Sequence, residues 1–268
     1  WTNPQTLGAI DLGAGIQGSG IAVRNRIVYL AGRSSSPAKS DFFVVNALDG
    51  QHPSVAADIN TGPGLNAVAL AGDFAYVAND DPTNQLQTIN ISATSSPVAI
   101  NNFHLSGNNE EALSVAVSGT LVLIGTKQAS GNELFLVDVT NPTVPLIKSS
   151  LEIGADLNRI FLAGDWAFLA TAKSDGEFLV VNIANPSVPA IAATVNLPGN
   201  AAATGLYVNS QDLRIYVTRS HADGTSPEIN VYDVSRPDTP LLLGSTEFGN
   251  DIPTVFAADN FAFIGTNV

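Results

Sequence analysis

Side chains that could bind a metal ion or an anion gather in short loops of this chain. Seven of them stand just before short apolar stretches: Asn66, Glu110, Glu111, Asp156, Asn158, Arg159 and Asp251. Carboxylate and amide oxygens suit a hard cation such as Ca²⁺, which takes about six to eight oxygen ligands. The predicted ligands for such an ion are Asn66, Glu110, Asn158 and Asp251. A solvated polar rim that binds no ion is the alternative interpretation.

Other chemistry has weaker support in the sequence. Residues Gly13–Gly18 match the G-x-G-x-x-G pattern of dinucleotide sites, but such a site needs a helix next, and the following residues alternate like a β-hairpin. The three histidines, His52, His104 and His221, have no metal or triad partner at a suitable spacing, so we predict surface positions. The sequence therefore shows no catalytic constellation.

The elements that position these residues are copies of one repeat. The clearest copy, Leu134–Pro145, is LFLVDVTNPTVP, and each copy has Asn or Asp at one place and proline seven residues later. The Asn and Asp anchors are Asn46, Asn90, Asp138, Asn182 and Asp233, with spacings of 44, 48, 44 and 51 residues. Because three of the five are Asn, charge is not required. We predict that each side chain accepts the backbone N–H two residues on.

One period holds four short strands separated by turn residues. Their predicted ranges after Asn46 are Ser54–Ile59, Ala67–Leu70, Phe74–Ala78 and Leu86–Ile91. A period of about 40–50 residues with four strands is typical of propeller blades. We therefore predict a single all-β domain over residues 1–268, a β-propeller of six four-stranded blades. Its repeats cover about 1–49, 50–93, 94–140, 141–184, 185–235 and, in part, 236–268.

The first and last strands decide how the ring closes. We label the strands of a blade A to D from the inside outward, and Leu7–Leu12 has the pattern of a D strand. It should complete the last blade beside the A and B strands at the other end of the chain. That blade would then lack one strand, C. If the native chain is longer by a whole blade, the ring has seven blades.

Composition narrows the class of partner. The net charge is −13, which argues against nucleic acid, and no apolar run is long enough for membrane insertion. Cysteine is absent, which excludes disulfides and thiolate metal sites. Only 13% of residues are charged. With the many Asn, Thr, Ser and Gly residues, this favours an extracellular or cell-surface location.

The repeat resembles the LVIVD repeat family of bacterial and archaeal β-propellers. The resemblance covers essentially the whole chain and is carried by Asp138, Asn141, Pro142, Pro145 and the hairpin text Val117–Gly119. It is weaker at Ala47–Gly50 and in the turn Asn209–Asp212. The family is largely of unassigned function, and its members are often exported and joined to further domains. The resemblance implies fold and compartment, and no particular reaction.

Arg159 is the exception within the repeat. The equivalent residues of the other repeats are small: Gly20, Ala67, Ser114, Gly205 and Thr254. We expect this position to face the central channel. Arg159 either fills the channel and pairs with Asp156, Glu110 or Glu111, or it binds an anionic group of a ligand, because Arg binds carboxylates in a bidentate way.

Two functions remain open at this stage. The first is a non-catalytic binding or structural module that contacts a protein or a glycan through its blade loops and needs no cofactor. The alternative is a metal-dependent hydrolase of the lactonase type with Ca²⁺ at the channel mouth. We favour the first, because loops on a rigid scaffold are the usual binding elements of repeat folds.

Overall fold

The fold is that of an all-β propeller. The computed structural model describes residues 5–34, 36, 38–209, 211–221, 224, 226–258 and 261–267. These residues form five four-stranded antiparallel sheets and one two-stranded sheet, each with its strands paired in chain order. Among them, no helix is long and apolar enough to cross a membrane. The predicted β-propeller is confirmed.

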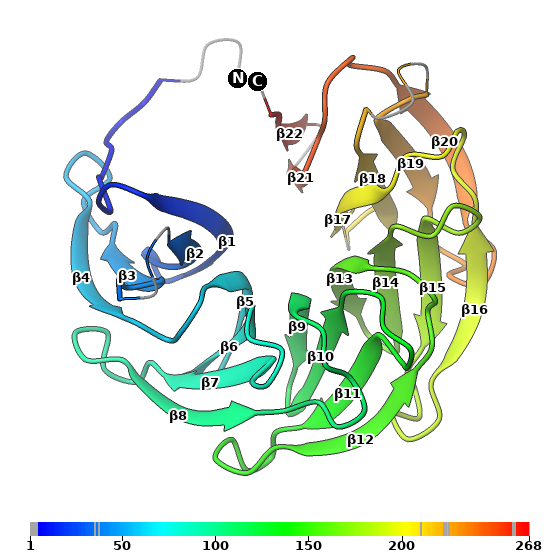
Figure 1. Ribbon diagram of the computed structural model, residues 1–268. Coiled ribbons are helices and arrows are strands. Elements are labelled where there is room, and N and C mark those ends of the chain that lie inside the picture. Colours follow the sequence, from blue (N-terminus) through cyan, green and yellow to red (C-terminus); the bar gives the residue numbers. More distant parts are fainter. Residues whose placement is uncertain are drawn as a thin grey trace.

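The sheets are arranged around a common axis as the blades of a propeller, and we call this ring of sheets the wheel (Figure 1). The innermost, A strands are β1 (Ile16–Arg24), β5 (Leu65–Ala71), β9 (Ala112–Ser118), β13 (Leu157–Ala163), β17 (Ala203–Asn209) and β21 (Thr254–Ala258). The B strands are β2 (Ile27–Ser34), β6 (Phe74–Asn79), β10 (Leu121–Thr126), β14 (Trp166–Thr171), β18 (Arg214–Arg219) and β22 (Phe261–Gly265).

The outer half of each blade consists of C and D strands. The C strands are β3 (Phe42–Asn46), β7 (Leu86–Asn90), β11 (Leu134–Asp138), β15 (Phe178–Asn182) and β19 (Ile229–Asp233). The D strands are β4 (Ser54–Ile59), β8 (Val98–Phe103), β12 (Leu146–Leu151), β16 (Ala190–Val195) and β20 (Leu241–Thr246). Each C strand has five residues, and nearly all of its first four residues are buried.

The anchor at the end of every C strand shapes the turn that follows. Oδ1 of the five anchors accepts the backbone N–H two residues on, at 2.7 to 2.9 Å. The predicted structural role of Asn46, Asn90, Asp138, Asn182 and Asp233 is thus confirmed. An Asn or Asp side chain satisfies this turn equally well, which explains why the charge varies.

The corner after the anchor also ties neighbouring blades together. Nδ2 of Asn101, on β8, donates to the carbonyl of Pro142 at 2.5 Å, and Oγ of Ser149, on β12, donates to that of Pro186 at 2.6 Å. Pro142 and Pro186 are the first prolines of their repeats. The repeated Asn-Pro corner therefore contacts the D strand of the preceding blade.

The hydrophobic core lies between blades. Each buried cluster joins side chains of two successive sheets; one contains Tyr76 and Leu86 of the second sheet and Ile124 and Phe135 of the third. Neither blade can bury these faces alone, which is the usual source of stability in a repeat fold.

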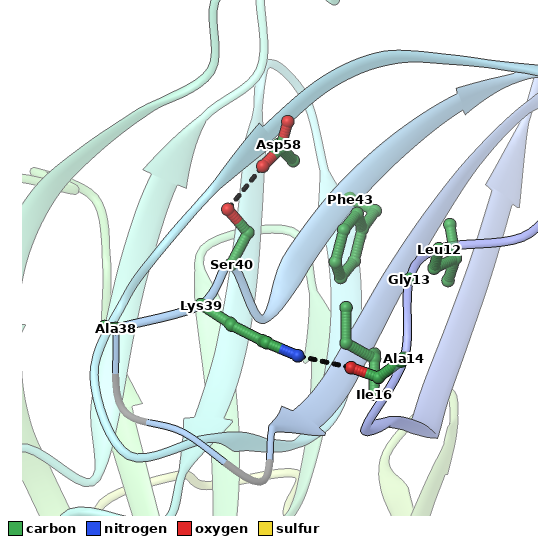
Figure 2. A pocket seen from close by; sticks show the side chains of 9 residues that line it. All are labelled: Leu12, Gly13, Ala14, Ile16, Ala38, Lys39, Ser40, Phe43 and Asp58. Atoms are coloured by element: carbon green, nitrogen blue, oxygen red, sulfur yellow. Dashed lines mark hydrogen bonds between the residues drawn. The ribbon is translucent and has the colours of Figure 1, made fainter.

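The predicted N-terminal strand is wrong. Residues 7–12 form no strand, and the last sheet, β21–β22, has two strands rather than three. The segment follows the first sheet instead: a Cβ added to Gly8 would lie 2.9 Å from Cδ of Pro53. Further on, Nζ of Lys39 donates to the carbonyl of Ala14, and Leu12 and Gly13 pass beside Phe43 (Figure 2). The segment lacks a partner because the described chain holds only five C strands.

The six sheets also leave the circle open. Every A strand packs beside the next one from β1 to β21, but β1 makes no extended contact with β21 or β22 (Figure 1). Ile21 and Val23 on β1 are consequently 64% and 61% exposed, whereas Ile160 and Val255, at the position of Ile21, are 5% and 6% exposed. The predicted closure of a six-bladed ring by the N-terminal strand is therefore wrong as well.

Candidate functional site

A β-bulge near the start of each complete A strand turns one side chain inward. The register against the B strand shifts at Ser19, Asn66, Leu113, Asn158 and Thr204. A bulge redirects the extra residue away from the alternating pattern of the strand. The same step thus recurs in five blades and brings five side chains towards the axis of the wheel.

Four of these side chains, all but that of Ser19, line a central cavity of about 240 Å³. Its lining comes from five blades: Asn66, Leu113, Asn158, Arg159, Thr204 and Pro253. Three of the predicted site residues, Asn66, Asn158 and Arg159, therefore meet at one place. The other four, Glu110, Glu111, Asp156 and Asp251, do not line this cavity.

Most polar groups at this level form a belt of hydrogen bonds between A strands. A side chain of each of the first five blades donates to a backbone carbonyl of the next. The pairs are Ser19 to Leu65, Asn66 to Ala112, Ser114 to Leu157, Asn158 to Ala203 and Thr204 to Ile252. The last four measure 2.7 to 2.8 Å. Asn66 and Asn158 thus hold blades together, whatever else they bind.

The rim above Asn66 carries a charged network, which we call the rim network: Arg33, Asn66, Asp80, Glu111 and Lys127. Nε of Arg33 donates to Oδ1 of Asn66 at 2.6 Å, and Nδ2 of Asn66 donates to Oδ1 of Asp80 at 2.9 Å. Nη2 of Arg33 lies 3.0 Å from Asp80 and 3.8 Å from Glu111, which also pairs with Lys127. Three blades contribute to this network.

The remaining predicted residues stabilise loops. Oδ1 of Asp156 accepts the backbone N–H of Gln128 at 2.8 Å, and Oδ1 of Asp251 accepts that of His221 at 2.7 Å. Each acid therefore ties the loop between its D and A strands to the B–C loop of the preceding blade. Glu110 is exposed.

Arg159 has no partner within the described residues. No hydrogen bond or ion pair involves its guanidinium, and burial alone lowers its pKa from the ordinary value. The expected pairing with Asp156, Glu110 or Glu111 is absent. Its repeat position also differs from the expectation. A Cβ at the equivalent Gly20 would lie 2.9 Å from Cα of Ala67, so this repeat position faces the next A strand. Arg159 nevertheless lines the cavity, because its side chain is long.

The sequence analysis missed a second repeated site. A fully buried acid or Gln precedes each C strand by one residue: Asp41, Gln85, Glu133, Glu177 and Glu228. A side-chain oxygen of each accepts the backbone N–H of the residue 20 positions later, at 2.5 to 2.9 Å. The signal was present, because each of these residues stands five positions before an anchor.

One histidine has closer neighbours than expected. Nδ1 of His221 contacts Oε1 of Glu228, and a carboxylate oxygen of Glu247 lies within 4.8 Å of both side chains. The expectation of no metal-type partner for His221 is therefore wrong. Glu228 nevertheless repeats the loop-capping role, since Oε2 accepts the N–H groups of Phe248 and Gly249.

The geometry favours an anion over a cation at the axis. The cavity holds the positive charge of Arg159, while Oδ1 of Asn66 already accepts a hydrogen bond from Arg33. A Ca²⁺ ion would need about six to eight oxygens and would be repelled by the guanidinium. Ca²⁺ binding by Asn66, Glu110, Asn158 and Asp251 stays a prediction, and the positive charge of Arg159 argues against it.

Comparison with known proteins addresses the fold and the repeat. The family model described as LVIVD repeat matches residues 66–104, 110–152 and 155–196. These stretches coincide with the second, third and fourth sheets, so one repeat corresponds to one blade. No curated protein matches the chain.

Solved structures share the fold at low sequence identity. A putative 6-phosphogluconolactonase from Bacteroides uniformis is 12% identical, with a TM-score of 0.77 over 92% of this chain and 77% of that chain. A quinonprotein alcohol dehydrogenase-like protein from Bacteroides thetaiotaomicron is 16% identical, with a TM-score of 0.66 over 95% and 61%. A chain of a nidogen/laminin complex is 11% identical, with a TM-score of 0.60 over 87% and 81%. The predicted LVIVD repeat is confirmed for part of the chain: this chain is a β-propeller whose second, third and fourth blades match the LVIVD repeat.

Proposed function

We propose that this propeller is a non-catalytic binding module, located outside the cell, that presents its channel-mouth face to a glycan or protein. That face carries the D–A and B–C loops of every complete blade, because these loops lie at the same end of the sheets. The rim network carries the proposal. Its side chains are partly exposed, at 44% for Arg33, 21% for Asp80, 18% for Glu111 and 46% for Lys127.

Preorganisation makes this network suited to binding. Asn66 is held by Arg33, Asp80 and the carbonyl of Ala112, so the charged groups around it have little freedom to lose. A polar surface that is already ordered spends less conformational entropy on binding. Mixed charges in fixed positions also select for a complementary polar partner.

The compartment and further partners belong to the same proposal. Low charge content and the exported character of similar repeat proteins support an extracellular or cell-surface site. Further domains in the same protein, as in many members of the resembling family, would let the propeller act as a recognition or spacer unit. Fractionation of the native host, with an antibody against the propeller, tests the location.

A pair of charge-matched variants tests the binding face. Wild type, Glu111→Gln and Asp238→Asn are compared on an array of glycans and extracellular proteins; Asp238 lies at an exposed C–D corner on the opposite face. A specific ligand should lose about tenfold in affinity with Glu111→Gln, because a charge-assisted contact is removed, and nothing with Asp238→Asn. Equal loss in both variants, or none in either, would contradict the proposal.

The metal-dependent hydrolase is the second candidate. It is supported by the convergence of Asn66 and Asn158 on one cavity and by the fold shared with a putative 6-phosphogluconolactonase. Thermal melting with Ca²⁺ and with EDTA, together with lactone hydrolysis assays, tests it. Turnover that EDTA abolishes would favour this candidate, whereas an unchanged melting temperature and no hydrolysis would remove it.

A further inference from the structure

Arg159 is a cation without a counter-charge in a molecule rich in acids. The chain has 24 acidic and 11 basic residues, yet no described carboxylate pairs with this guanidinium. Two of the three expected partners are engaged elsewhere, Asp156 with Gln128 and Glu111 with Lys127 and Arg33, and the third, Glu110, is exposed. The five N–H donors of the guanidinium therefore remain available to a ligand.

A guanidinium in this place needs an anion. Arginine stays protonated at neutral pH even when burial lowers its pKa, so the charge persists in the cavity. A partly desolvated charge is costly unless it is paired and hydrogen-bonded. The equivalent residues of the other blades are small, so packing of this layer does not require an arginine.

The rest of the lining indicates what accompanies the anionic group. Asn158 and Thr204 offer polar atoms beside Arg159, and Leu113 and Pro253 offer apolar surface. A volume of about 240 Å³ is smaller than the ~300 Å³ at which sites for drug-sized ligands begin. The cavity therefore suits a molecule the size of one sugar unit that carries both hydroxyl groups and a short carbon skeleton.

We propose that Arg159 binds the carboxylate of a small hydroxylated acid, such as a sugar acid, in the central cavity. The two carboxylate oxygens accept parallel hydrogen bonds from the guanidinium, and Asn158 and Thr204 face the hydroxyl groups. The inference deepens the proposed function, since it assigns a ligand class to the same face of the propeller. This inference rests on the proposed function in one respect, which is that the channel-mouth face is a binding surface.

Calorimetric titration with free sugars tests the ligand class. Glucuronate is compared with glucose, its neutral counterpart, on wild type, Arg159→Gln and the control Arg236→Gln, which removes the same charge from an exposed position. Glucuronate should bind wild type and Arg236→Gln with equal affinity, and it should bind Arg159→Gln at least about tenfold more weakly. Glucose should bind none of the three proteins. Equal binding to wild type and Arg159→Gln, or no binding of glucuronate, lactate or acetate up to about 10 mM, would overturn the proposal.

Thermal melting tests the role of the Arg159 charge without depending on the choice of one acid as ligand. In buffer poor in small anions, Arg159→Met should melt at a higher temperature than wild type, because it removes a half-buried charge that has no partner among the described residues. Added carboxylate should then raise the melting temperature of wild type only. A lower melting temperature of Arg159→Met in the anion-poor buffer would reveal a partner within the protein and overturn the proposal. An equal response to chloride, sulfate and acetate would reduce the effect to general salt and overturn it too.

The two proposals can fail separately. If glucuronate binds through Arg159 while Glu111→Gln leaves every macromolecular ligand unaffected, the rim network is not the binding surface and only the proposed function falls. If macromolecules bind through Glu111 and no carboxylate binds at Arg159, the ligand class alone is wrong.

Discussion

The middle blades and the two ends of this propeller have the same sequence pattern and different surroundings. Ile160 on β13 and Ile21 on β1 are identical residues at one repeat position, yet Ile160 is 5% exposed and Ile21 is 64% exposed. The last sheet behaves likewise: Phe263 is 41% exposed, whereas the equivalent Phe168 is 2% exposed. An apolar residue of a blade becomes core only when the neighbouring blade is present, which makes the blade interface the unit of stability.

Hydrogen bonds follow the same rule. Each bond of the belt joins the side chain of one A strand to a carbonyl of the next blade, so the described belt ends at Ile252, just before the last A strand, β21. The buried acid or Gln before each C strand, in contrast, caps the loop that follows the D strand of the same blade, and this bond is present in all five complete blades. The first and last blades therefore keep the local structure of a blade and lack the hydrogen bonds and the burial that a neighbouring blade would supply.

The largest expected contrast is between the two isoleucines. Ile160→Ala should lower the free energy of unfolding by about 2–4 kcal/mol, because it leaves a cavity in a packed interface. Ile21→Ala should change it by less than about 0.5 kcal/mol, because its side chain contacts water. Urea unfolding of both variants measures the difference. A large effect of Ile21→Ala would show that another segment covers β1 in solution.

A smaller effect is expected from the belt between blades. Asn158→Ala should cost about 1–3 kcal/mol, because the buried carbonyl of Ala203 loses its donor. Asn158→Thr is the matched control, since Thr204 makes this bond naturally in the next blade. Chemical denaturation should therefore rank the variants as wild type, Asn158→Thr, Asn158→Ala. Equal stability of all three would show that the belt contributes nothing.

A further effect depends on pH and concerns the cap of the first blade. Burial raises the pKa of Asp41 from 3.8 to about 6. The folded protein thus holds this proton more tightly than the unfolded chain, and the contribution of Asp41 to stability falls as pH rises from about 4 to 6. Relative to Asp41→Asn, wild type should gain stability as the pH is lowered through that window and show a constant difference above about pH 7.

Asp138 provides the opposite sign for the same experiment. Hydrogen bonds from Thr140 lower the pKa of this half-exposed anchor. Its contribution is present above the ordinary pKa and is lost as the pH falls through the lowered value. Melting curves of Asp138→Asn and Asp41→Asn between pH 3 and 8 should therefore diverge in opposite directions from wild type. Parallel trends would contradict the assignment for Asp41.

Prediction from the sequence succeeded where the repeat carries its own information. The anchors, the order of the four strands and the alignment of Arg159 with Gly20 and Ser114 all follow from local spacing, and the strand register agrees with them. Prediction failed at Leu7–Leu12, where the pattern of a D strand is present and the partner strand is absent. A strand needs a neighbour for its hydrogen bonds, and no spacing within one segment reveals whether that neighbour exists.

The candidate site, too, has features that the sequence determines and features that only the tertiary structure determines. By itself, the sequence determined the all-β propeller, its repeat and the placement of polar residues before the A strands, because these features depend on contacts close along the chain. Only the tertiary structure decided that Asn66, Asn158 and Arg159 share one cavity while Asp156 and Asp251 hold loops. The bulges set the direction of each inner side chain, and the neighbouring blade sets its partner. Arg159 has no partner among the described residues, so its charge marks the position where we expect a ligand.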